Sequence, residues 1–476
     1  MKFGDWILFF LTLTFSILVI SEALSNDSEP KGEDVSVEDI FEPQSEPFWT
    51  KGLRLSLGEK TSTQPAICSL RSPPALEQSE GTTSSCGAWG EEIYAVWSDN
   101  RVGQRDLFMR RSKDGGLTWS QEERLTESKV DSVRPVIASD SKQVHLVWEE
   151  KSEANSEIFY TRWDGMGWSK EQVLSEGLSN SRRPDVAVTT GSSASMVYVV
   201  WESSVQNRLV AYLTWSADGG ASWAEPRPIA NITNASDIPA WNSSEPRVAC
   251  GERTAYVVWR DERALEIPPS SFDKGGVELT RQVRGQIFIK RWDDVSSGND
   301  IRLSAEGDYR RPDVSVSEPS VYVAWEGKSG GTSAFVSDIF VAQSFDGGQT
   351  FSRALQVTQS AAESTMPRII AFADDAWLFW QDGRLGNWGI YLARKSSREQ
   401  NWGQPQQFTS TDIDSIMPVA SPETRFLGEN GSLTAENQRR RQFEAERSEQ
   451  IHLLWVERES DAKSHLMYSR RDTIPP

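Results

Sequence analysis

Acidic and guanidinium side chains recur along this chain at two sets of positions that could together hold a charged ligand. An acid follows closely after each of seven recurrent tryptophans, at what looks like a comparable position each time: Asp99, Glu149, Glu202, Asp261, Glu326, Asp382 and Glu457. Arginines lie beside prolines at a second set of recurrent positions: Arg134, Arg182, Arg183, Arg247, Arg310, Arg311 and Arg368.

These two sets allow two interpretations. In the first, arginines hold a carboxylate or sugar hydroxyls, while acids accept hydrogen bonds or donate a proton. In the second, arginine–acid pairs join neighbouring repeats without any ligand, each exposed pair contributing about 0–1 kcal/mol. Because the pattern recurs in nearly every repeat, whereas a catalytic site should be asymmetric, the second interpretation is favoured for most members. The candidates for ligand binding are Arg134, Arg183, Arg247, Arg310, Arg311, Arg368, Asp99, Glu202 and Glu326.

One segment departs from the regular pattern. Asp308, Tyr309, Arg310 and Arg311 are consecutive, which places a phenol beside two guanidinium groups. This makes Tyr309 a candidate nucleophile, and the catalytic candidates as a set are Tyr309, Asp261 and Asp382. The three histidines are scattered and the three cysteines show no metal-ligand spacing, so no metal site and no cofactor is expected.

The seven tryptophans define the period that positions these side chains. Each ends a short apolar strand such as YVVW, and successive ones lie roughly 50 to 75 residues apart, as in repeats of four-stranded units with insertions. The tryptophans are Trp97, Trp148, Trp201, Trp259, Trp325, Trp380 and Trp455. The pattern predicts an all-β fold, a seven-bladed β-propeller of four-stranded antiparallel blades. Because the last unit lacks a fourth strand, residues 47–59 are expected to complete it next to the strand at His465, which closes the ring and removes exposed sheet edges.

A glycine-rich phrase recurs three times after a third strand, as SKDGGLTW at 112–119, SADGGASW at 216–223 and SFDGGQTF at 344–351. Asp114, Asp218 and Asp346 can accept backbone N–H bonds within such a turn, and the glycines permit positive φ. These aspartates are therefore assigned a structural role.

The phrase is the Asp-box, and over residues 48–472 the chain resembles the Asp-box (bacterial neuraminidase repeat) superfamily of sialidase-like β-propellers. The resemblance implies that the Asp-box turns lie on the face opposite the ligand site. It also implies what a working sialidase would need: an arginine triad for the substrate carboxylate, a tyrosine nucleophile paired with glutamate, and an aspartate acid/base. The chain departs from that family because its Arg-Ile-Pro motif is absent and because sialidases typically have six blades.

The N-terminus is expected to direct export. Residues 1–25 contain an apolar run followed by small residues, which indicates a signal peptide or an uncleaved anchor. Residues 26–46 are acidic and poor in aromatics, so they are interpreted as a disordered linker. The propeller is assigned to 47–472, with insertions at 264–284 and 423–449.

Bulk properties limit the partners. A formal charge of -19 and a pI near 4.8 repel phosphate backbones, so a nucleic-acid partner is excluded. Membrane contact is expected only through an uncleaved N-terminal anchor. A disulfide between Cys68 and Cys86 is an open alternative to free thiols.

Two functions remain open at this point. The first is an exported, secreted, periplasmic or cell-surface monomer that binds a glycan or an extracellular protein without catalysis. The second is an enzyme, either an exo-sialidase-like glycoside hydrolase or a lyase that acts on an acidic sugar.

Overall fold

The structure is a computed structural model that describes most of the repeat region. The described residues are 49–58, 60–72, 90–140, 142–189, 195–231, 241–263, 285–293, 296–305, 307–329, 336–359, 361–372, 375–396, 399, 401–410, 412–422 and 450–471. All of them belong to one compact unit, Pro43–Pro476. The expected signal peptide or anchor, the linker, both insertions and Cys86 lie outside the described residues.

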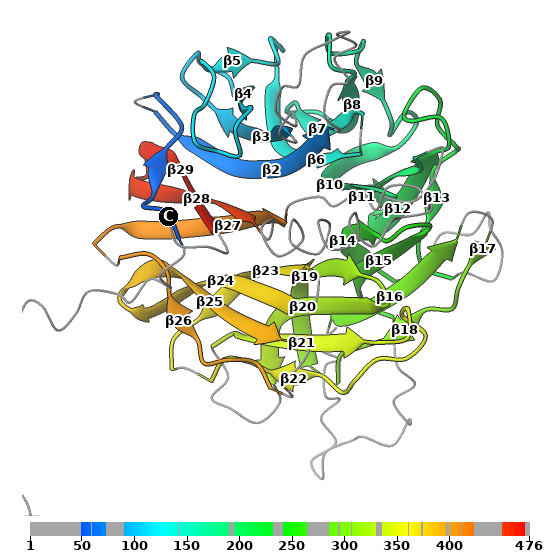
Figure 1. The fold of residues 1–476 in the computed structure, drawn as a ribbon. Coiled ribbons are helices and arrows are strands. Elements are labelled where there is room, and N and C mark those ends of the chain that lie inside the picture. Colours follow the sequence, from blue (N-terminus) through cyan, green and yellow to red (C-terminus); the bar gives the residue numbers. More distant parts are fainter. Residues whose placement is uncertain are drawn as a thin grey trace, which may run out of the picture. The chain divides into compact units, whose positions relative to one another are not determined.

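The described strands form seven antiparallel sheets of four main strands each, which confirms the seven-bladed β-propeller predicted from the tryptophan period (Figure 1). Blade 1 contains β2 (Ser62–Ser72), β3 (Gly90–Asp99), β4 (Asp106–Ser112) and β5 (Glu123–Arg124). Blade 2 contains β6 (Asp131–Ser139), β7 (Val144–Lys151), β8 (Ser156–Trp163) and β9 (Gln172–Val173). Blade 3 contains β10 (Ser179–Val188), β11 (Val197–Val205), β12 (Arg208–Ser216) and β13 (Arg227–Pro228).

The remaining blades repeat this order. Blade 4 contains β14 (Ser243–Cys250), β15 (Thr254–Asp261), β16 (Gln286–Asp293) and β17 (Ser296–Ser297), and β18 (Ile301–Arg302) also pairs with β16. Blade 5 contains β19 (Gly307–Ser317), β20 (Ser320–Ser329), β21 (Asp338–Ser344) and β22 (Leu355–Gln356). Blade 6 contains β23 (Ser364–Phe372), β24 (Asp375–Leu385), β25 (Asn387–Ser396) and β26 (Gln406–Gln407). Blade 7 contains β27 (Asp414–Pro422), β28 (Ile451–Ser460), β29 (Lys463–Arg471) and β1 (Leu53–Arg54).

The second strand of each blade packs on both faces, which explains its unbroken apolar sequence. In β11, Val197 to Trp201 are all fully buried, with Val200 in the cluster toward blade 4 and Val199 in the cluster toward blade 2. Since successive side chains of a strand point to opposite faces, a strand between two neighbouring blades needs apolar residues at both parities. The core is therefore a series of clusters between adjacent blades.

The ring closes through the N-terminal strand, as the sequence predicted. Leu53 is paired with Tyr468 and Arg54 with Met467, so β1 lies beside β29 (Figure 1). The next residue, Leu55, is fully buried in the cluster that contains Trp97 of blade 1. The first residues of the propeller thus join its last blade to its first.

The three Ser-x-Asp-Gly-Gly turns join third and fourth strands and also contact the preceding blade. In the second of them, the Gly220 N–H donates to Ser216 Oγ at 2.8 Å and the Ser222 N–H donates to Asp218 Oδ1 at 2.8 Å. Trp223, which ends the turn, packs edge-on against Tyr160 of blade 2 with ring centroids 4.8 Å apart. Equivalent tyrosines meet the second glycine of the other two turns, namely Tyr468 at Gly116 and Tyr256 at Gly348.

Each first strand carries a β-bulge at a residue that precedes proline. At each of these positions the ladder register shifts and the pre-proline residue has φ between 49° and 56°. A bulge adds one unpaired residue and redirects the local backbone, so these positions project from the regular ladder. The seven residues are Gln64, Arg134, Arg183, Glu245, Arg311, Met366 and Met417, and we call them the pre-proline ring.

Within the described ranges, no helix is long and apolar enough to cross a membrane.

Candidate functional site

The first strands of all seven blades line one cavity of about 890 Å³ along the centre of the propeller. Its walls include the pre-proline ring at the start of these strands and Gly251, Glu252 and Glu318 beyond the ends of two of them. We call this cavity the channel. Because the first strands all run in the same direction along it, residues at equivalent positions form layers around the channel wall.

The pre-proline ring is held in place by hydrogen bonds between blades. At six junctions, the backbone N–H of a pre-proline residue donates to a carboxylate or amide oxygen of the preceding blade, at 2.6 to 3.3 Å. A bulge leaves its N–H without a ladder partner, and a buried donor without a partner is costly. The donor and acceptor residues are Arg134 and Gln64, Arg183 and Glu149, Glu245 and Glu202, Arg311 and Glu245, Met366 and Glu326, and Met417 and Gln381.

The seven acids after the tryptophans are not equivalent, contrary to the sequence interpretation. Those one residue after the tryptophan accept the pre-proline N–H bonds just described: Glu149, Glu202 and Glu326. Those two residues after it lie on the other side of the strand: Asp99, Asp261, Asp382 and Glu457. In three blades the tryptophan indole donates to this second position, as Trp259 does to Asp261 at 2.8 Å. A shift of one residue thus separates a buried acid that accepts a pre-proline N–H bond from one that lies on the side of its own tryptophan.

The arginines of the mouth pair with glutamates of their own blade or of the next one. Arg134 donates to Glu149 at 2.6 Å within blade 2, and Arg311 donates to Glu326 at 2.8 Å within blade 5. Arg183 reaches from blade 3 to Glu245 of blade 4 at 2.9 Å. A guanidinium has five N–H donors, so these contacts leave donors available. The side chains of Arg183 and Arg311 are 44% and 45% exposed.

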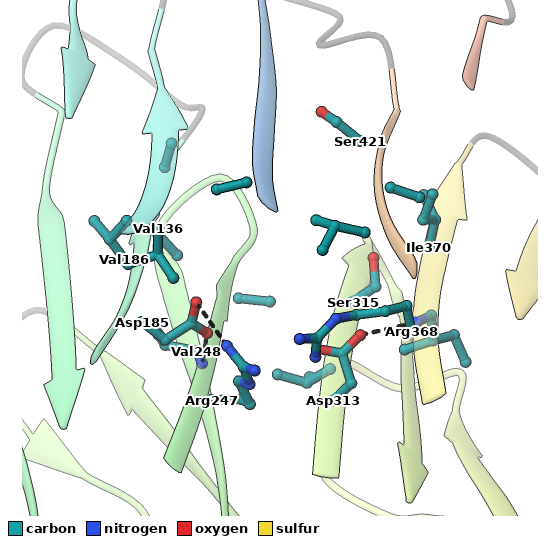
Figure 2. Close-up of a pocket in the computed structure, with 18 of the residues that line it drawn as sticks. Val136, Asp185, Val186, Arg247, Val248, Asp313, Ser315, Arg368, Ile370 and Ser421 are labelled. Atoms are coloured by element: carbon teal, nitrogen blue, oxygen red, sulfur yellow. Dashed lines mark hydrogen bonds and ion pairs between the residues drawn. The ribbon is translucent and has the colours of Figure 1, made fainter. Parts of the chain in front are cut away.

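Two residues farther along the first strands, two charged pairs line the channel wall. Asp185 of blade 3 faces Arg247 of blade 4 at 3.5 Å, and Asp313 of blade 5 faces Arg368 of blade 6 at 3.5 Å. Figure 2 shows Arg247 and Arg368 pointing toward one another, each beside its aspartate. Each aspartate also accepts a backbone N–H of the next blade, from Val248 at 2.9 Å and Ile369 at 2.8 Å.

The electrostatics of this layer favour an added anion. Burial, and then the neighbouring positive charge of Arg247, lowers the pKa of Arg368 to about 10. Burial also raises the pKa of Asp185, although Arg247 opposes this shift. Each of the two arginines stays partly exposed and contacts its carboxylate only at 3.5 Å, so guanidinium N–H donors remain for another acceptor. An anion between the two arginines would accept hydrogen bonds from them.

The layer is also asymmetric. In blades 3 to 6 the residue after the proline is charged, as Asp185, Arg247, Asp313 and Arg368. In blades 7, 1 and 2 the same position is aliphatic, as Val419, Ala66 and Val136. Arg247 and Arg368 were predicted from the sequence as ligand-binding candidates, whereas Asp185 and Asp313 were not. The signal was the repeated Arg-Arg-Pro-Asp-Val at 182–186 and 310–314, each followed one blade later by Pro-Arg.

The candidate nucleophile lies inside the blade core. Tyr309 is 4% exposed and packs edge-on against Trp325 and Phe340, with centroids 6.4 and 5.5 Å away. Burial raises the pKa of its phenol. Its neighbours Arg310 and Asp308 pair with each other at 2.7 Å. The structure thus separates Tyr309 from the arginines that line the channel.

The two candidate catalytic acids are bound by arginines two residues later in the chain. Arg263 donates to both carboxylate oxygens of Asp261 at 2.8 Å, and Arg384 binds Asp382 in the same way at 2.8 and 2.6 Å. Burial works against ionisation of Asp382, but hydrogen bonds from Arg384 and other neighbours outweigh it and hold the pKa of this carboxyl below its usual range. Asp99 is bound by Arg101 at the equivalent position of blade 1.

Among the described residues, no group of three or more histidine, cysteine or acidic side chains is arranged to hold a metal ion.

Comparison with known proteins identifies the fold. The chain matches no protein-family model and no curated protein sequence. It is similar to the solved structure of polysaccharide lyase Uly1, with TM-score 0.51 and 7% identity over 89% of this chain and 100% of that one. A complex of Trypanosoma rangeli sialidase with the inhibitor DANA gives TM-score 0.41 and 13% identity over 74% of this chain and 56% of that one. Phage phi92 endosialidase gives TM-score 0.40 and 12% identity over 80% and 65%.

The chain therefore spans little more than half the length of the Trypanosoma rangeli sialidase. The likeness to Uly1 and the seven sheets define the class of fold, a seven-bladed β-propeller.

Proposed function

We propose that this chain is an exported, monomeric and noncatalytic propeller that binds an acidic glycan at the pre-proline mouth of its channel. The observation that carries the proposal is the pair Arg247 and Arg368, which point toward one another across the channel and each contact an aspartate only at 3.5 Å. A carboxylate or sulfate placed between two guanidinium groups accepts several charge-assisted hydrogen bonds.

The half-exposed arginines of the mouth extend this site. Arg134, Arg183 and Arg311 lie at the mouth of the same channel and retain donors beyond those bound to glutamates. Glu245, which lines the mouth, can accept hydrogen bonds from sugar hydroxyls. A chain of acidic sugars, with one acid group between Arg247 and Arg368, would meet both the arginine donors and the glutamate acceptor.

The fold supports a glycan as the ligand. The similar solved structure Uly1 is a polysaccharide lyase. Export, suggested by residues 1–25, would bring the module to glycans outside the cell or in the periplasm.

The proposal of a noncatalytic role rests on the positions of the candidate catalytic groups. Tyr309 is buried against aromatic rings, while Asp261 and Asp382 are each bound by an arginine through both carboxylate oxygens. A carboxyl with a lowered pKa, such as that of Asp382, is a poor proton donor at neutral pH.

A glycan array tests the proposal, followed by titration calorimetry with the best acidic ligand. We expect binding to glycans with carboxylate or sulfate groups and not to their neutral counterparts. Arg247→Gln and Arg368→Gln should each weaken binding about tenfold or more, in line with the 1.5–3 kcal/mol of a charged hydrogen bond. Arg394→Gln is the matched control, because Arg394 pairs with Asp375 outside the channel-lining residues. Equal binding of neutral glycans, or full affinity in both channel variants, would refute the proposal.

One observation favours a second candidate, a lyase that acts on an acidic polysaccharide. Asp185 lies in the channel beside Arg247, and burial raises the pKa of its carboxyl, as suits a group that exchanges protons with a substrate. Lyase cleavage creates a carbon–carbon double bond that absorbs ultraviolet light. An increase in ultraviolet absorbance with an acidic polysaccharide, lost in Asp185→Asn, would establish this activity instead.

A further inference from the structure

The channel has a charged side and an uncharged side. Both sides can be recognised in the pre-proline ring and again in the next layer, formed by the residues that follow the prolines. In the pre-proline ring, blades 2 to 5 contribute Arg134, Arg183, Glu245 and Arg311, whereas blades 6, 7 and 1 contribute Met366, Met417 and Gln64. In the next layer, blades 7, 1 and 2 contribute the aliphatic residues Val419, Ala66 and Val136. Blades 7 and 1 are uncharged in both layers, so one wall of the channel is apolar or neutral throughout this depth.

This wall is accessible to a ligand. Met417, Val419 and Val136 line the channel and are all partly exposed. Deeper in the channel the next layer consists mostly of small side chains, Cys68, Ala138, Ala187, Ala249, Ser315 and Ser421, with Ile370 the exception. Figure 2 shows Val136 and Val186 on the side of the channel across from Ile370. Small residues leave room for a ligand group beyond the charged layer.

The two sides place opposite demands on a ligand. An acid group gains from Arg247 and Arg368, but a wholly polar ligand would remain against an aliphatic wall and gain nothing there. A group that displaces water from Val136 and Val419 gains free energy in proportion to the apolar area it covers.

We infer that the ligand is an amphipathic acid, an acidic sugar that carries an alkyl substituent. Its anionic group lies toward blades 3 to 6, and its apolar substituent lies against Met417, Val419 and Val136. This inference rests on the proposed function, because it names the class of ligand for the same channel.

Calorimetric titration of the full chain with three probes tests the inference: glucuronate, a series of alkyl glucuronides of increasing chain length, and the matching alkyl glucosides, all below their micelle concentrations. We expect glucuronate to bind weakly and each added methylene to raise affinity by up to about fourfold until the apolar wall is covered. The alkyl glucosides, which lack the anion, should bind at least tenfold more weakly than the glucuronides.

The double variant Val136→Thr with Val419→Thr keeps the shape of both side chains and makes the wall polar. It should lose the gain in affinity per methylene, with an unchanged thermal melt as evidence of folding. Equal affinity for glucuronate and its alkyl glycosides would overturn the amphipathic ligand and leave the acidic-glycan proposal in place. Absence of binding by every glucuronide, or equal binding of the glucosides, would overturn the proposed function and this inference with it.

Discussion

The hydroxyl of Tyr160 in blade 2 occupies the space that a Cβ atom on Gly220 of blade 3 would need. An ideal Cβ at Gly220 would lie 1.7 Å from this oxygen. The Ser-x-Asp-Gly-Gly turn therefore requires glycine for two reasons, its φ of +83° and the close approach of a tyrosine from the neighbouring blade. The turns at Gly116 and Gly348 receive Tyr468 and Tyr256 in the same way.

Gly220→Ala should destabilise the propeller more than the same change at Gly177. Gly177 has a similar φ of +80° but no heavy atom within 4 Å of its ideal Cβ, so its replacement measures the backbone cost alone, about 1–2 kcal/mol. Displacement of Tyr160 should add about 1–3 kcal/mol at Gly220. Chemical denaturation of both variants measures the difference in the free energy of unfolding. Equal losses of stability would show that Tyr160 moves aside without cost.

Leu55→Ala should weaken ring closure. Leu55 is fully buried with Trp97 and Leu454, at the junction of the first and last blades, so truncation should cost about 2–5 kcal/mol. Leu57→Ala is the matched control, because Leu57 is 58% exposed two residues later. Circular dichroism melts of the two variants measure the effect. A Leu55→Ala protein as stable as Leu57→Ala would contradict the role assigned to this strand.

Glu202→Ala should destabilise the junction of blades 3 and 4. Glu202 is fully buried, accepts the Glu245 N–H at 2.8 Å, and binds Arg182 at 2.8 Å. Its removal leaves a bulge donor and a guanidinium without their acceptor, which costs about 2–4 kcal/mol. The exposed Glu176, changed to alanine, should have little effect. Hydrogen exchange at Glu245 N–H provides a local readout, and unchanged protection there would argue against the inter-blade bond.

Asp140 should make the propeller sensitive to acid. Burial raises its pKa, but the His145 imidazole 4.0 Å away and hydrogen bonds from the N–H groups of Lys142 and Gln143 outweigh this and lower it to about 2. Because the folded pKa lies below the unfolded value, the stabilisation is present above about pH 4 and is lost as the pH falls toward 2. The contribution is about 2 kcal/mol.

Asp140→Asn should remove this contribution and flatten the dependence of the denaturation midpoint on pH over that window. The exposed Asp461 offers a control in Asp461→Asn. If the denaturation midpoint of Asp140→Asn depended on acidic pH as steeply as that of the parent, the role assigned to Asp140 would be wrong.

The sequence predicted the features that depend on local pattern. Tryptophan spacing and apolar runs such as YVVW identified seven sheets, because a strand packed on both faces must be apolar along its length. The missing fourth strand of the last unit identified the pairing of β1 with β29, since a closed ring leaves no edge.

The sequence did not predict which charged groups face one another in the channel. Asp185 meets Arg247 and Asp313 meets Arg368 only because adjacent blades stand side by side, a relationship between residues more than 50 positions apart. The two kinds of acid after the tryptophans were treated as one, because a one-residue offset reverses the side of a strand and is visible only once the strand's register is known. Tyr309 stood out by its neighbours in sequence, whereas its burial depends on Trp325 and Phe340.

A crystal structure of the protein with bound glucuronate tests the central claim most directly. We expect the carboxylate between Arg247 and Arg368, within hydrogen-bonding distance of both guanidinium groups and beside Asp185 and Asp313. A carboxylate bound only at the outer arginines, with the space between Arg247 and Arg368 filled by water at saturating ligand, would contradict it.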